Sequence, residues 1–274
     1  MRHSEFYTIL NNNFQKLSEI YIKTKPGGGI ATPEDQELSR AFVLLIHAEM
    51  ENYFEAVCHA ILNKSHEDLK KGNVNKQMVG LIAFNSGAPE SYGELLVKKT
   101  KKKGEDTADD DKKNAKFLPR KLSDRIAKLV NMHYKNNIEN NHGIAAKYLA
   151  PMFVPFGLTD EVLDPIFICN LDLFAAKRGL YAHKSRDHDE VKLGSINPND
   201  LLKEAEILIY GDSSYDDNDS TISCISKFDK WAIDKIDKDI TISDYYGVPT
   251  VSFSRKLMWM IIRIFSKCDK RLRY

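Results

Sequence analysis

Cysteine is scarce in this chain of 274 residues, and its four copies, at 58, 169, 224 and 268, lie far apart. None belongs to a C-x-x-C pair, which excludes a zinc ribbon and a redox dithiol and favours reduced thiols. Long hydrophobic runs are missing too, because the most apolar stretch, 257–265, is about half of the ~20 residues that cross a bilayer. The first residues lack the apolar core of a signal peptide. We therefore expect a cytoplasmic protein with no membrane partner.

Neither sign of charge is in excess, because 40 Lys and Arg stand against 39 Asp and Glu. This balance excludes a uniformly basic nucleic-acid binder, although it allows a local basic site. Basic residues gather at 98–103, at 177–186 and near the C-terminus, whereas acidic residues prevail over 187–244. The charges therefore leave room for a small phosphate-binding site in an otherwise neutral protein.

The motifs of several common enzyme sites are also absent. The chain has no G-x-G-x-x-G after a strand, no G-x-x-x-x-G-K-[ST], no H-E-x-x-H and no G-x-S-x-G. No motif therefore supports a nucleotide-binding, zinc-protease or serine-hydrolase function. We also expect no cofactor.

What the chain does contain is helical periodicity. Apolar residues recur at steps of three and four, the spacing of one helix face. Strand signals are few and unpaired, so the predicted fold is an all-α helical bundle. The spacing predicts helices over about 4–24, 33–63, 66–84, 122–133, 145–152, 159–178, 198–210, 222–236 and 254–269.

Three regions are predicted along the chain. Residues 1–32 form an N-terminal helix and linker, 33–210 form a helical domain, and 211–274 form an acidic segment with a C-terminal helical extension. Within the domain, 85–116 is a long charged insertion with few apolar side chains to offset ordering entropy, so we expect it to be flexible.

One short motif could carry chemistry: Arg178 and His183 form an R-x4-H sequence near the end of an apolar helix. A guanidinium fork binds two phosphate oxygens and an imidazole moves a proton near neutral pH, so the pair suits phosphodiester cleavage. In an unbroken helix the two residues lie about 140° apart around the axis. They converge only if the helix ends or bends, which Gly179 would permit, or if a second copy completes the geometry. An Arg and a His at this spacing are also common as structural or surface residues.

A polar stripe marks the long helix predicted over 33–63, where His47, Glu51, Glu55 and His59 follow one another at intervals of four. One interpretation is a metal centre, although the Glu-x-x-His on facing helices that such centres use is missing. A second is that Glu51 orients the motif residues across the bundle. A third is a solvated face with pairs at i, i+4.

The stripe and the motif together resemble a known family. The long helix reads RAFVLLIHAEMENYFE over 40–55 and is followed much later by the R-x4-H sequence, a combination similar to HEPN-domain proteins and most closely to the RiboL-PSP-type group. The resemblance covers about 35–210 and leaves the N-terminal helix and the region after 210 unexplained. It implies a helical bundle, a homodimer and, in many members, a metal-independent endoribonuclease that acts as a toxin or antiphage effector, restrained by an antitoxin or regulatory protein.

The resemblance also implies roles for individual residues. Arg178 would hold the scissile phosphate, His183 would act as general base or general acid, and Glu51 would position one of them. Attack by the ribose 2′-hydroxyl needs no metal and leaves a 2′,3′-cyclic phosphate. The basic residues around the motif are the expected RNA contacts: Lys177, Lys184 and Arg186.

Gly179 departs from the family pattern, in which a polar residue often follows the motif arginine. Some members of the family are inactive binding or dimerisation modules. The alternative function is therefore a non-catalytic helical module that binds RNA or a partner protein.

Overall fold

The computed structural model describes residues 3–23, 31–86, 122–183, 197–212 and 221–237. Every regular element in these ranges is a helix, which confirms the predicted all-α fold. None of these helices combines the length and the apolar character that a membrane span requires. The elements in chain order are α1 (Glu5–Tyr21), α2 (Pro33–Lys70), α3 (Lys76–Ser86), α5 (Leu122–His133), the π-helix η2 (Tyr134–Glu139), α6 (Ala146–Phe153), the 3-10 turn η3 (Val154–Phe156), α7 (Pro165–His183), α8 (Pro198–Tyr210) and α9 (Ile225–Asp237).

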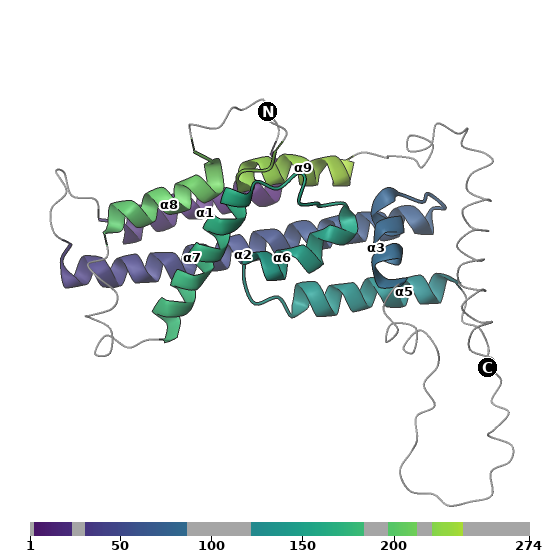
Figure 1. Ribbon diagram of the computed structural model, residues 1–274, viewed down its shortest axis with the longest axis horizontal. Coiled ribbons are helices and arrows are strands. Elements are labelled where there is room, and N and C mark those ends of the chain that lie inside the picture. Colours follow the sequence, from purple (N-terminus) through teal and green to yellow (C-terminus); the bar gives the residue numbers. More distant parts are fainter. Residues whose placement is uncertain (1–2, 24–30, 87–121, 184–196, 213–220, 238–274) are drawn as a thin grey trace, which may run out of the picture.

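Helix α2 is the spine of the bundle, and α1, α7, α8 and α9 pack along it (Figure 1). It begins with a capping box, in which the Thr32 side chain accepts from the Asp35 backbone N–H and the Asp35 carboxylate accepts from that of Thr32. Its 38 residues extend for about 57 Å at 1.5 Å per residue. Because several helices pack along it, a broad face of α2 is fully buried, including Phe42, Val43 and Met50.

The predicted boundary between the second and third helices was wrong. Helix α2 continues to residue 70 instead of 63, and α3 begins at residue 76 instead of 66. The turn between them depends on Gly72, with φ +88°, and on Asn75, whose Oδ1 accepts from the Met78 N–H at 2.9 Å. The Asn75 amide also donates to Asp68 at 3.2 Å. These caps depend on individual side chains, so the spacing of apolar residues does not predict where the helices end.

Helix α7 also begins later than predicted, at Pro165 instead of residue 159. Asp164 caps it, because its Oδ1 accepts from the Ile166 N–H at 2.7 Å, and proline follows at the first helical position. The preceding Leu163 pairs in an isolated parallel bridge with Ile222, which is why α9 begins at residue 225 and not at 222. The charged insertion beyond residue 86 and the predicted helix 254–269 lie outside the described residues.

Helix α9 enters the same core as α2 and α6. Phe228 lies with its ring centre 5.2 Å from that of Phe54 and 4.9 Å from that of Phe153, both close to edge-on, and 5.3 Å from that of Trp231. Edge-to-face pairs of this kind add about 0.5–1.5 kcal/mol each beyond the area that they bury. The segment after residue 220 is therefore part of the packing around α2.

The start of α1 is tied to α9 through one fully buried carboxylate. Asp229 accepts from the Ser4 backbone N–H at 2.8 Å and from the Tyr53 hydroxyl at 3.0 Å, and it also binds the Ser4 hydroxyl. Nδ1 of His3 lies 3.3 Å away. A buried carboxylate needs such partners to offset its desolvation, so α1, α2 and α9 meet at one satisfied polar cluster.

A second buried polar group, His133, ends α5. Its imidazole is 2% exposed, with Nε2 3.8 Å from Cys58 Sγ and Nδ1 3.0 Å from the Asn137 amide nitrogen. Burial lowers the pKa of His133 from 6.5 to about 4, so the ring is neutral at pH 7.

We expect this histidine to make the fold acid-sensitive. Unfolding returns the pKa of His133 from about 4 toward 6.5. Between these pH values the unfolded chain therefore binds a proton that the folded chain does not bind. The stability that is present above pH 6.5 is lost as the pH falls toward 4. Urea unfolding at pH 7 and pH 4 measures this loss. His133→Gln cannot take up the proton and should lose about 3 kcal/mol less than the wild type between these pH values. Equal losses in the two proteins would contradict the assignment.

Candidate functional site

The two motif residues stand on one continuous helix. Helix α7 runs without a break from Arg178 through Gly179 to His183, where it ends, so no helix end falls between the two motif residues. Five helical steps separate the two positions, which therefore lie about 140° apart around the helix axis. The side chain of His183 lies outside the described part of the structure.

Arg178 lines a hollow of about 390 Å³ where α2, α7 and the segment leading into α6 meet. The hollow combines cationic, acidic, imidazole and aromatic groups from these three parts of the chain. Its lining residues are His47 from α2, His142, Gly143, Ala145, Lys147 and Tyr148 from the segment around the start of α6, and Asp172, Ala175, Ala176 and Arg178 from α7.

From α2, His47 lines the hollow, and Glu51 lies one turn further along the helix. The His47 ring is 2% exposed, and its Nδ1 lies 3.7 Å from Glu51 Oε2. Burial, with a smaller contribution from the positive charge of Arg178, lowers the pKa of His47 to about 4. Burial and the neighbouring Glu55 raise the pKa of Glu51, while Arg178 partly offsets that rise. The fold thus brings Arg178 within electrostatic reach of Glu51, as one interpretation of the stripe required.

The other two residues of the predicted stripe face elsewhere. Glu55 accepts from the Asn141 amide at 3.0 Å, and His59 is exposed, with its Nε2 3.0 Å from the Asn63 amide nitrogen. Among the residues that the structure describes, no three His, Cys, Asp or Glu side chains are arranged to hold a metal ion. Of the four stripe residues, His47 lines the hollow, Glu51 and Glu55 are half-buried, and His59 is exposed.

The wall opposite α2 was not predicted as functional from the sequence. Gly143 turns the chain in front of His47 with φ +155°, a conformation that favours glycine. The Ala146 N–H then donates to Asp172 at 2.8 Å, which fixes the start of α6 against α7. Lys147 Nζ lies 4.8 Å from the centre of the Tyr148 ring. The turn-forming run of Asn, Asn, His and Gly over 140–143 was the available signal.

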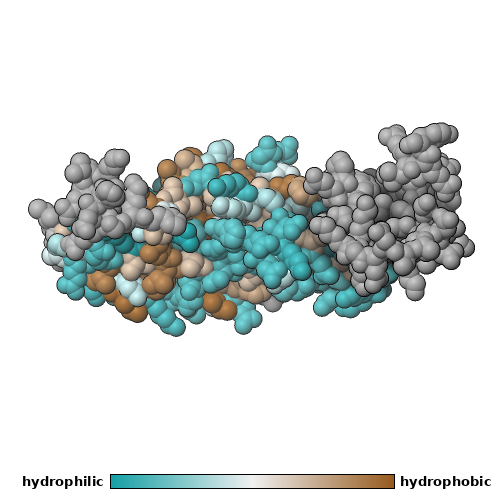
Figure 2. Space-filling view, turned by 90° about the horizontal axis from the view of Figure 1, so that it is seen from below, coloured by the Kyte–Doolittle hydropathy of each residue, from teal (hydrophilic) through white to brown (hydrophobic). Residues whose placement is uncertain are grey.

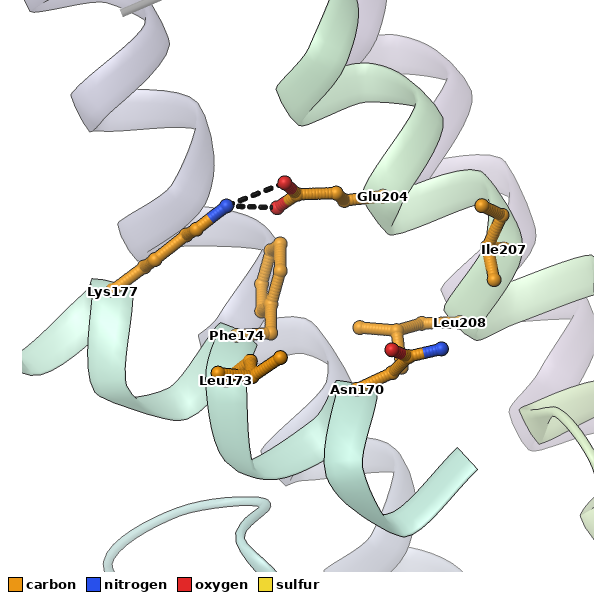
Figure 3. Close-up of a pocket in the computed structure, with 7 residues that line it drawn as sticks. All are labelled: Asn170, Leu173, Phe174, Lys177, Glu204, Ile207 and Leu208. Carbon is orange, nitrogen blue, oxygen red and sulfur yellow. Dashed lines mark hydrogen bonds and ion pairs between the residues drawn. The ribbon is translucent and has the colours of Figure 1, made fainter. Parts of the chain in front are cut away.

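The basic residues of the motif region do not share one environment. Lys177 crosses to α8 and pairs with Glu204 over a separate groove of about 170 Å³ (Figure 3). Arg178 has no ion-pair partner among the described residues, so its guanidinium is available to an anion. Two other predicted RNA contacts, Lys184 and Arg186, lie outside the described residues.

Hydrophobic residues also reach the surface of the bundle. Figure 2 shows hydrophobic patches scattered among the hydrophilic residues of one face. On α7, Ile166 and Leu173 are each 58% exposed and lie seven residues apart, which places them on the same side of the helix. Helix α7 therefore carries the motif and also presents apolar side chains to solvent.

Comparison with known proteins agrees with this architecture. A family model described as RiboL-PSP-HEPN matches residues 8–210, a segment that contains α2, the hollow and the R-x4-H motif. The match begins inside α1, so it includes most of the N-terminal helix that the resemblance over 35–210 left out. No curated protein and no solved structure gives a significant match. Because the family model covers well over half of the chain, the protein belongs to the RiboL-PSP-HEPN family.

Proposed function

We propose that the protein is a metal-independent endoribonuclease whose R-x4-H motif cleaves RNA. The observation that carries the proposal is the position of Arg178, which lines a polar hollow with no carboxylate paired to it in the described part of the chain. Such a guanidinium can bind two oxygens of a phosphodiester. Membership of the RiboL-PSP-HEPN family is a second support for the proposal.

The proposed reaction uses the ribose itself as nucleophile. The 2′-oxygen forms a bond to phosphorus and the bond from phosphorus to the 5′-oxygen breaks, so the products are a 2′,3′-cyclic phosphate and a 5′-hydroxyl. One proton leaves the 2′-hydroxyl and one is delivered to the 5′-oxygen. His183 serves one of these transfers, while Arg178 stabilises the charge on the non-bridging oxygens.

We infer that Glu51 is a positioning residue in this site. Its carboxylate lies 3.7 Å from His47, which lines the hollow, and its charge and that of Arg178 influence each other. A carboxylate near the guanidinium restricts the directions in which that side chain can point. Neutral His47 adjoins Glu51 without adding a second positive charge at pH 7.

The arrangement of α7 supports a homodimer with shared sites. Positions 178 and 183 lie about 140° apart around one helix, so we expect that a single α7 does not bring both side chains to one phosphate. A two-fold axis near the end of α7 would set Arg178 of one protomer beside the second protomer's His183. The exposed Ile166 and Leu173 provide apolar surface on the same helix.

The first test is cleavage of a labelled RNA by the purified full chain in excess EDTA. We expect cleavage to continue in EDTA, to yield a cyclic phosphate end and to fall by about a hundredfold or more in His183→Ala. His59→Ala serves as the control, because this exposed histidine of α2 lies away from the hollow and should leave the rate unchanged. Cleavage that stops in EDTA, or that survives in His183→Ala, would refute the proposal.

We place the enzyme in the cytoplasm as a toxin or an antiphage effector, held in check by an antitoxin or regulatory protein. The support for this role is the family relationship. Induced expression of the wild-type chain should then arrest growth, and His183→Ala, produced to the same level, should not. Growth that is equal with both chains would argue against the role.

A second candidate function is a non-catalytic module that binds RNA or a partner protein. Gly179 favours it, because active members of the family often carry a polar residue after the motif arginine. This function predicts RNA binding without turnover in the same assay.

A further inference from the structure

The hollow extends beyond what holding one phosphate requires. Arg178 and His47 line one part of it, whereas residues from 142 to 148 form a second wall: His142, Gly143, Ala145, Lys147 and Tyr148. At about 390 Å³ the volume falls within the range of about 300–1,000 Å³ that is typical of sites for small organic groups. The second wall therefore has room to receive a part of the substrate beside the scissile phosphate.

The second wall carries groups that bind nucleotides. Tyr148 offers a half-buried aromatic ring, and His142 beside it offers an exposed imidazole. Bases of single-stranded RNA stack on such rings, and each stacking contact is worth about 1–3 kcal/mol. Lys147 carries its ammonium over the Tyr148 ring, 4.8 Å from the ring centre, where it could hold a phosphate that adjoins a base bound at this ring.

The remaining polar groups of the hollow suit a nucleotide better than they suit a metal ion. Asp172 is already engaged by the Ala146 N–H, and no three metal-binding side chains gather among the described residues. Neutral His47 has one donor and one acceptor nitrogen, so it can form hydrogen bonds with the edge of a base. Gly143 lies against His47, where a Cβ would be 3.5 Å from the ring and would narrow the hollow.

We propose that this hollow binds one nucleotide of the RNA strand, with its base against Tyr148, the phosphate beyond it on Lys147 and the scissile phosphate on Arg178. The ligand assigned here rests on the proposed function. The inference adds a subsite to it: residues outside the R-x4-H motif hold the substrate, and the base in the hollow sets the position of the cut.

The test measures binding separately from cleavage. The probes are short fluorescein-labelled oligoadenylate, oligouridylate and oligocytidylate in 2′-fluoro form, which lack the attacking hydroxyl. Fluorescence anisotropy in EDTA gives their affinities for the full chain. Tyr148→Leu should weaken binding about tenfold or more, whereas Tyr148→Phe keeps the ring and should stay within about twofold of the wild type.

Two further variants complete the set. Tyr134→Leu removes a partly exposed tyrosine of the π-helix that does not line the hollow, and it should bind as the wild type does. Lys147→Ala should reduce the slope of log affinity against log salt by about 0.7, the value for one phosphate contact on a single strand. Thermal unfolding of each variant shows whether the fold is retained, so that a change in affinity can be assigned to the site.

The outcomes separate the subsite from the cleavage chemistry. Wild-type affinity in Tyr148→Leu, or equal losses in the Leu and Phe variants, would overturn the subsite even if RNA is cut. Binding through Tyr148 by a chain that never cleaves would retain the subsite and refute the ribonuclease. Competition with free nucleoside monophosphates distinguishes the source, because monophosphates that bind as tightly as the oligonucleotides would overturn the assignment to an RNA strand.

Discussion

Co-expressed Arg178→Ala and His183→Ala chains are expected to recover about a quarter of wild-type RNA cleavage, although each variant alone loses about a hundredfold to ten-thousandfold. The reason is the unbroken helix between the two positions, which sends them to different faces of α7. If each site takes its arginine from one protomer and its histidine from the other, a mixed dimer contains one intact site and one that lacks both groups. Half of randomly paired dimers are mixed, which gives the expected fraction.

Differently tagged chains, purified in two steps, isolate the mixed dimers and raise the expected recovery to about half of the wild-type rate per dimer. The doubly substituted chain, Arg178→Ala with His183→Ala, co-expressed with wild type is the control. Its mixed dimers should have no intact site, because each site lacks one of the two groups. Inactive mixed dimers of the two single variants would show that one protomer supplies both groups.

The second large effect concerns the packing of α3 rather than the site. Gly80 lies in α3 against η3, and a Cβ at this position would be 2.1 Å from the carbonyl oxygen of Pro155. A backbone atom cannot rotate away, so Gly80→Ala must separate α3 from η3 or distort one of them. We expect a loss of about 3 kcal/mol or more in the free energy of unfolding, measured by urea denaturation.

Gly179→Ala is the matched control, because it is the same change inside another helix. No described atom lies within 4 Å of a Cβ at this position. Alanine in an open helical position lowers the entropy of the unfolded chain, so this variant should be more stable than the wild type by about 0.5–1 kcal/mol. If Gly80→Ala matched this gain, the contact between α3 and η3 would not be as close as described.

The all-α fold could be predicted from the sequence because apolar residues recur at the steps of three and four that mark a helix face. The intervals of four along α2 also single out Glu51 as a candidate, and in the structure the charge of Arg178 acts on this carboxyl. The helix boundaries at Asn75 and Asp164 could not be predicted from that spacing, because each depends on one side chain that accepts from one N–H.

The opposite wall of the hollow was missed for a different reason. Tyr148 and Lys147 line the same hollow as Arg178 because the chain turns at Gly143 and because Asp172 holds the first turn of α6. Neither contact is local in the sequence, and a tyrosine next to a lysine is unremarkable by itself. The sequence motif thus identified the group expected to bind the phosphate but not the residues around it.

The buried carboxylate of Asp229 has a consequence for how the protein should be produced. The family match ends at residue 210, yet Asp229 and Phe228 lie beyond it and the Ser4 that Asp229 binds lies before it. An expression boundary placed at the ends of the match would deprive Tyr53 of its acceptor and uncover the rings of Phe54 and Phe153. The segment shared with the family is therefore shorter than the unit that folds.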